Sequence, residues 1–139
     1  MGVNWKEMPI EELKWLAEQG NDSAMVEFGL RCIFGNMNER DREQGRIWLE
    51  KAAVLGDDMG EYGMALISES AEERVEWYKK AAAQGNVAAL IDLAQCYRDG
   101  DGVAKNDEEA FKIYETLAQQ GNSYAAHMIK KFYSSGGES

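Results

Sequence analysis

Apolar residues recur along this chain at helical spacing. In one clear stretch they occupy positions i, i+3, i+4, i+7 and i+8, at Ala110, Ile113, Tyr114, Leu117 and Ala118. Such spacing places the side chains on one stripe of an α-helix, which packs against a neighbouring helix. The pattern predicts helices, with ends placed to within about two to four residues, over 9–18, 22–34, 41–55, 58–68, 71–84, 87–98, 107–120 and 123–134.

A short phrase occurs four times and ends each time in Gly-Asn or Gly-Asp. Its glycines are Gly20, Gly56, Gly85 and Gly121, so the period is 36 residues, then 29, then 36 again. A period in this range is typical of arrays of helix pairs. A left-handed glycine can end one helix, and the Asn or Asp that follows can cap the next. We therefore expect tight corners between antiparallel helices at these four places.

Side-chain size repeats in register with the corner glycines. Four residues after each glycine the side chain is small, at Ala24, Gly60, Ala89 and Ala125. Eight residues after, it is large, at Phe28, Met64, Leu93 and Ile129, and the next places hold Gly29, Ala65, Ala94 and Lys130. A large side chain beside a small one lets neighbouring helices approach closely. Lys130 departs from this pattern, and its departure predicts that the last unit is the capping end of the array.

These residues resemble the Sel-like repeat family, a relative of the tetratricopeptide repeat, over about residues 9–133. The clearest stretch contains Ala89, Leu93, Ala94, Tyr97, Gly100, Gly102, Val103 and the Gly121 corner. Ala94 and Ile113 replace the usual glycine and tryptophan, and Met37 and Asn38 replace a loop glycine and valine. The unit that ends at Gly85 lacks the glycine loop.

The resemblance implies an all-α fold, namely a short right-handed α-solenoid of stacked antiparallel helix pairs. The first helix of each pair would line a concave face. We expect an N-terminal lead over 1–8, the repeat array over 9–133 and a flexible Gly/Ser-rich tail over 134–139. The family packs an aromatic side chain between helices where this chain has Trp48 and Trp77, so both are predicted core residues. Trp5 and Trp15 are expected either to cover the first helices or to touch a partner.

The chain is strongly acidic, with 25 Asp and Glu against 15 Lys and Arg and a formal net charge of -10. Such a surface repels phosphate backbones and anionic lipids, so we expect neither nucleic-acid nor membrane partners. A basic protein partner would be attracted, although acidic surfaces also simply keep proteins soluble. No apolar run approaches the roughly 20 residues that span a bilayer, and the N-terminus lacks a signal-peptide core. We predict a cytoplasmic protein.

Residues that could carry chemistry occur without the partners that chemistry needs. His127 has no nearby Ser or Cys nucleophile and no second histidine. The segment Asp99 to Gly102 is similar to the start of a calcium loop, but Ala110 stands where the bidentate Glu belongs. Cys32 and Cys96 have no other ligand residue at metal-binding spacing, so we predict that both are buried apolar residues. We therefore expect no catalytic residues, no metal and no cofactor.

The remaining candidate for a functional site is the helix face opposite the core. The places six, ten and thirteen residues after each corner glycine form what we call the inner row: Val26, Leu30, Ile33, Tyr62, Leu66, Ile91, Gln95, Arg98, His127 and Lys131. This row is unusually apolar for a solvated surface, and an exposed apolar patch often marks an interaction site. The alternative is that tight curvature or an oligomer contact already buries it.

The sequence thus predicts a non-catalytic protein–protein interaction module that binds a protein or peptide in its concave face. Small acidic members of the resembled family look like inhibitor or immunity proteins, so a basic toxin or effector is one expected partner. Two alternatives stay open: a regulatory adaptor or scaffold, and a hydrolase or small-ligand binder, for which no nucleophile and base occur at sensible spacing. The protein is expected to be a monomer or a weak homo-oligomer.

Overall fold

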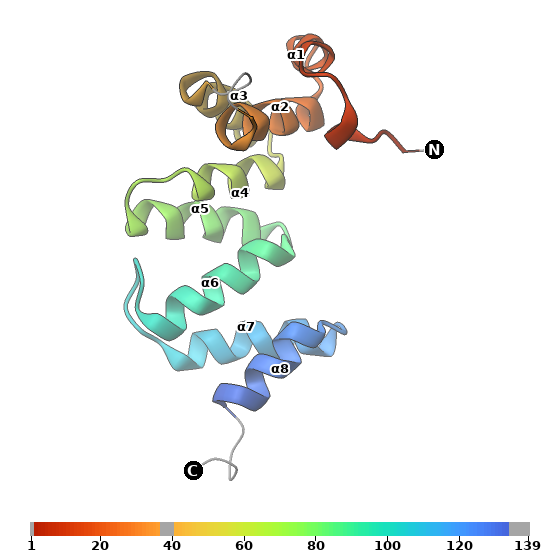
Figure 1. Cartoon of the computed structure of the whole chain (residues 1–139). Helices are drawn as coiled ribbons and strands as arrows, with labels where there is room; N and C mark the ends of the chain where they lie inside the picture. Colours follow the sequence, from red (N-terminus) through yellow and green to blue (C-terminus); the bar gives the residue numbers. More distant parts are fainter. Residues whose placement is uncertain (1, 37–40, 134–139) are drawn as a thin grey trace. The chain divides into compact units, whose positions relative to one another are not determined.

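A computed structural model of the chain describes residues 2–36 and 41–133. The described residues contain one short 3₁₀ helix, η1 (Trp5–Glu7), and no strand; their α-helices are α1 (Ile10–Glu18), α2 (Asp22–Phe34), α3 (Arg42–Val54), α4 (Asp58–Leu66), α5 (Ala71–Ala83), α6 (Val87–Asp99), α7 (Asp107–Gln119) and α8 (Ser123–Phe132) (Figure 1). All predicted helices are present, and the all-α repeat fold is confirmed. The predicted tail 134–139 and the replacements at Met37 and Asn38 lie outside the described residues.

The helices form two compact units, Met1–Ser68 and Glu69–Ser139. In the first unit, α2 packs against α1, α3 and α4 and also contacts η1. In the second unit, α6 packs against α5 and α7, and α7 packs against α8. Helices that follow one another in the chain are therefore neighbours in space within each unit, as a helical repeat requires.

The four Gly-Asn and Gly-Asp corners share one backbone geometry. Each glycine has a positive φ, between 87° at Gly85 and 97° at Gly20. Its N–H donates three residues back and the next N–H donates five residues back, as in Gly20 to Ala17 at 3.0 Å and Asn21 to Leu16 at 3.1 Å. The Asn or Asp side chain then accepts the N–H of the third residue on. One dipeptide thus ends a helix and caps the next, as predicted.

Two glycines let α2 and α3 approach closely. A Cβ atom on Gly45 would lie 2.7 Å from the carbonyl oxygen of Gly29 and 2.5 Å from a side-chain atom of Ile33. Beside this crossing the rings of Phe28 and Trp48 meet edge to face, with centroids 6.2 Å apart. Trp48 is buried, which agrees with its predicted place in the core. The crossing is the contact that sets the position of α3 on α2.

The core of the second unit lies among α6, α7 and α8. Tyr114 and Leu117 of α7 are buried against Ala94, Ala110, Ala125 and Met128. The predicted small places Ala24, Gly60, Ala89 and Ala125 are all buried, whereas Lys130 is exposed. Trp77, in contrast, is only half-buried beneath the Lys80 ammonium, 4.4 Å from its ring centre, so its assignment to the core holds only in part.

Candidate protein-binding surfaces

The inner row is partly buried and partly open in the first unit. Val26 and Ile33 are only 7% and 9% exposed, so for these two the alternative holds and they serve core packing. Ile33 is covered because α3 crosses it at Gly45. Leu30 and Tyr62 are half-buried, and Leu66 is exposed. The exposed apolar surface of the inner row in the first unit is therefore narrower than the sequence predicted.

In the second unit the inner row becomes polar toward its end. Ile91, Gln95 and Arg98 of α6 are half-buried, while His127 and Lys131 of α8 are exposed. The Gln95 amide donates to the Tyr124 hydroxyl at 3.0 Å and so joins α6 to α8.

Arg98 lies against two neighbours. Its Nε donates to the Asp99 carboxylate at 3.2 Å, and its guanidinium stacks 4.2 Å from the Phe132 ring centre. In the second unit the inner row is therefore more polar than in the first unit.

A pocket of about 280 Å³ opens on the inner side of α2. Its lining comes from η1, α2 and the start of α4, at Trp5, Lys6, Ser23, Val26, Glu27, Leu30, Asp57 and Met59. The inner-row residues Val26 and Leu30 both line this pocket. Trp5 folds back and forms one wall of the pocket.

One arginine holds the N-terminal segment in this place. Arg31 donates to the carbonyl oxygens of Met8 at 2.6 Å, Trp5 at 2.7 Å and Lys6 at 3.1 Å. Its guanidinium also lies 3.6 Å from the Glu27 carboxylate. Hydrogen bonds from a charged donor are among the strong ones. Sequence reasoning missed Arg31 because its partners lie more than twenty residues away and contribute only backbone atoms.

Two carboxylic acids share a proton beside the same pocket. Asp57 caps α4 and accepts the N–H groups of Met59 at 2.8 Å and Gly60 at 3.1 Å. Burial, followed by its hydrogen bond with Asp22, raises the pKa of Asp57 from 3.8 to about 6. The same hydrogen bond lowers the pKa of Asp22. Asp57 is therefore the proton donor of the pair, and the pocket rim gains negative charge as the pH rises through about 6.

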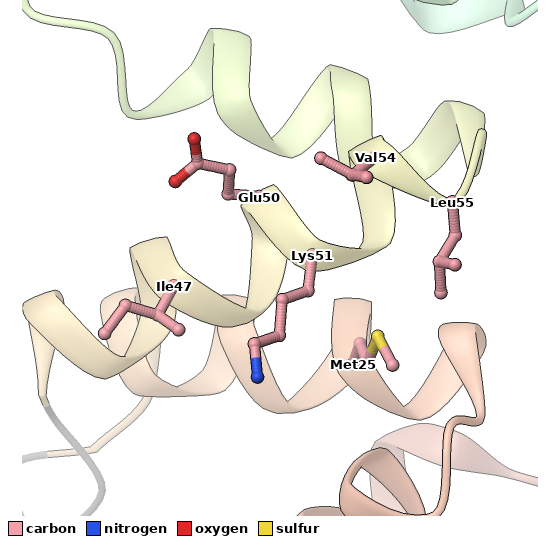
Figure 2. A pocket seen from close by; sticks show the side chains of 6 residues that line it. All are labelled: Met25, Ile47, Glu50, Lys51, Val54 and Leu55. Atoms are coloured by element: carbon pink, nitrogen blue, oxygen red, sulfur yellow. The ribbon is translucent and has the colours of Figure 1, made fainter.

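The outer side of the first unit carries a second, larger pocket of about 460 Å³. Figure 2 shows its lining, with Met25 from α2 and the rest from α3 and its C-terminal end, at Ile47, Glu50, Lys51, Val54 and Leu55. Ile47, Val54 and Leu55 are 39%, 81% and 61% exposed. None of the residues that line this pocket belongs to the inner row. Its signal in the sequence is that Ile47, Val54 and Leu55 are apolar where the other repeats have polar or small residues.

Burial suppresses the ionisation of one cysteine and one tyrosine in the second unit. Burial raises the pKa of the Cys96 thiol to about 11 and that of the Tyr114 phenol to about 12, so both stay protonated at neutral pH. Asp99 and Asp101 line a polar pocket of about 320 Å³. Across the described residues, no group of three or more His, Cys, Asp or Glu could hold a metal ion. None of the described helices is long and apolar enough to cross a membrane.

Comparison with known families agrees with the repeat geometry. The Sel1 repeat model matches residues 23–57, 54–86 and 87–122, which correspond to the helix pairs α2–α3, α4–α5 and α6–α7. The chain belongs to the Sel1 repeat family. The three segments between successive corner glycines are therefore Sel1 repeats.

Two relatives of this Sel1 repeat chain are named regulators, and a similar solved structure is a Sel1 repeat protein. A 50-residue stretch, 36% of this chain, is 54% identical to the exopolysaccharide production negative regulator of Rhizobium leguminosarum bv. viciae and covers 19% of it. The chitin synthase regulator SKT5 of Saccharomyces cerevisiae is 28% identical over 91% of this chain and 20% of its own length. The chain thus spans about a fifth of these relatives. A Sel1 repeat protein from Oxalobacter formigenes superposes with a TM-score of 0.79 at 28% identity, covering 87% of this chain and 98% of that one.

Proposed function

We propose that this Sel1 repeat protein is a non-catalytic interaction module that binds a partner protein on the inner face of its first unit. The observation that carries the proposal is the pocket beside Leu30, with Tyr62 and Leu66 offering further apolar surface on α4. A preformed groove on packed helices binds with little ordering cost. The family, whose repeats typically mediate protein interactions, and the regulators among its relatives support the same function.

The partner that best fits this face is a basic protein that the module inhibits. The chain carries a formal net charge of -10, and two carboxylates, Glu27 and Asp57, line the pocket against one amine, Lys6. Complementary charge accelerates encounter and makes association sensitive to salt. An immunity protein against a basic toxin is the narrowest form of this proposal.

The test is affinity capture with a paired variant. Leu30→Asp with Tyr62→Asp places two charges on the proposed face, and we expect the partner to be lost while far-ultraviolet circular dichroism stays near wild type. The matched control is Val87→Asp with Thr116→Asp, which adds the same charge at two exposed residues of the second unit. A partner retained by the inner-face variant, or lost equally from both variants, would contradict the proposal.

A regulatory adaptor is the second candidate, because both relatives described above are named regulators. The two functions differ in what purified components should show. An inhibitor should bind one basic target with an affinity that falls steeply as salt rises. An adaptor should bind several partners more weakly and with little dependence on salt, which titration calorimetry at two ionic strengths would reveal.

A further inference from the structure

The outer face of α3 differs from the matching face of the other three corner helices. Nine residues before each corner glycine stand Glu11, Glu76 and Lys112, but the α3 repeat has Ile47. Two residues before, the others have Glu18, Ala83 and Gln119, and α3 ends in Val54. One residue before, three glutamines, Gln19, Gln84 and Gln120, correspond to Leu55. The same structural places are thus polar or small in three repeats and large and apolar in one.

These apolar residues are exposed and border an open pocket. Val54 has 81% of its surface exposed. Neither solvation nor helix propensity explains a valine at this position, because its side chain is apolar and it is a weak helix former. Together with Ile47 and Leu55 it surrounds the pocket of about 460 Å³ whose floor is the buried side chain of Met25. A cluster of this kind on one helix is typical of a surface that another protein covers.

The order of residues along this face is complementary to itself. We call Ile47, Glu50, Lys51 and Val54 the outer stripe; their spacing of i, i+3, i+4 and i+7 places them on one side of α3. Read in either direction, the stripe runs from an apolar residue through a pair of opposite charges to an apolar residue. An antiparallel copy therefore matches apolar with apolar and acid with base.

We propose that the outer stripe of α3 is a homodimer contact, with a two-fold axis that passes between Glu50 and Lys51. In a two-fold contact the same patch is used by both copies. Ile47 then faces Val54 of the second copy, and Glu50 faces Lys51 of the second copy, each pair occurring twice. Leu55 of each copy lies at the edge, where it can enter the pocket above Met25 of the other.

The contact is small, so the dimer is weak and concentration-dependent. Stable interfaces bury about 1,200–2,000 Å² in total, more than one helical stripe supplies. The like net charge of the two copies opposes association further. Sedimentation of the full chain over about a hundredfold range of micromolar concentrations should therefore show a reversible monomer–dimer equilibrium. A wild-type chain that stays monomeric over that range would overturn the proposal and leave the stripe to another partner.

The first variant tests the apolar pairs. Val54→Glu places a charge against Ile47 of the other copy and should weaken dimerisation at least about tenfold. The side chain is exposed, so folding should be unaffected. Val87→Glu is the matched control, because it adds the same charge at an exposed valine of the second unit and should leave the equilibrium unchanged. Equal dimerisation by both variants would overturn the proposal.

The second set of variants tests the two-fold axis itself. Glu50→Lys alone and Lys51→Glu alone each oppose like charges and should weaken dimerisation by roughly threefold to tenfold. The double exchange restores complementarity and should return it to wild type. An equimolar mixture of the two single variants should form a heterodimer, since one chain then carries two basic side chains at these places and the other carries two acidic ones. Failure of both the double exchange and the mixture would exclude this axis.

This contact is independent of the function proposed above, because it uses the outer side of α3 and not the inner side of α2 and α4. The Leu30→Asp, Tyr62→Asp variant should still dimerise, and Val54→Glu should still bind the partner. Each proposal can therefore fail alone. A variant that lost both properties would instead show that the first unit had unfolded.

Discussion

At the residue scale, glycine serves two separate purposes in this chain. Gly85 occupies a corner with φ of 87°, and a Cβ atom there would meet nothing within 4 Å. Gly45 lies inside α3, where a Cβ atom would collide with the Gly29 carbonyl and Ile33. The first glycine is needed for its backbone conformation, and the second for the space that it leaves. The two needs give different responses to substitution.

Gly45→Ala should lower the free energy of unfolding by about 2 kcal/mol, because the added methyl forces α3 away from α2. Since alanine is the better helix former, any loss measures the crossing alone. Urea denaturation would measure it, with Gly85→Ala as a comparison that should cost about 1 kcal/mol through its left-handed backbone only. An unchanged or higher stability for Gly45→Ala would show that α2 and α3 are not in close contact.

At the element scale, the Asp57 side chain joins the start of α4 to the start of α2. It caps α4 through two backbone N–H groups, and it hydrogen-bonds to Asp22 at the first residue of α2. Burial, followed by this second bond, raises the pKa of Asp57 to about 6, above its ordinary value of 3.8. A proton bound more tightly in the folded state stabilises that state only while it is bound.

Asp57→Asn should therefore flatten the pH dependence of stability. In the wild type, the contribution of Asp57 is complete below pH 3.8 and is lost as the pH rises through about 6. An asparagine keeps the cap and donates to Asp22 at every pH, so it should gain about 1 kcal/mol at neutral pH, a figure reduced because Asp22 is exposed and screened. Thermal unfolding at pH 4, 5, 6 and 7 would test this. Asp58→Asn, which also removes one charge, should keep the wild-type slope.

At the scale of the whole molecule, the proposed binding face is covered in part by the beginning of the chain. Arg31 holds Trp5, Lys6 and Met8 through their carbonyl oxygens. The segment includes only one short 3₁₀ helix with no buried residues. Segments with little buried surface open locally at a low free-energy cost. The wall that this segment gives to the pocket beside Leu30 therefore depends on one side chain, Arg31.

Arg31→Met should release this segment without unfolding the first unit. We expect faster tryptic cleavage after Lys6 and loss of hydrogen-exchange protection at the Glu7 and Met8 amides, which donate within η1. The unfolding free energy of the whole chain should change by less than about 1 kcal/mol. Arg46→Met, a change of the same type at an exposed residue of α3, should leave cleavage at Lys6 as in the wild type. Equal cleavage in both variants would contradict the role given to Arg31.

Much of the fold followed from the sequence because the signals are local. Helical periodicity, the glycine corners and their Asn or Asp caps act within five residues, so Gly20 and Asn21 are enough to end α1 and begin α2. Register was equally predictable, since the same sizes recur at the same distance from each corner. The residues of the inner row could be identified from their distance to each corner glycine. That distance does not show whether another segment buries them.

The tertiary structure alone decided which of these residues reach solvent. Val26 and Ile33 are buried because α3 crosses α2 at two glycines and the N-terminal segment folds back, contacts that no local pattern encodes. Arg31 and the Asp22–Asp57 pair have partners far along the chain, so only packing brings them together. The outer stripe of α3 needed both kinds of information. The sequence shows that Ile47 and Val54 are apolar where the other repeats are polar or small. Only the structure shows that these side chains are exposed beside an open pocket.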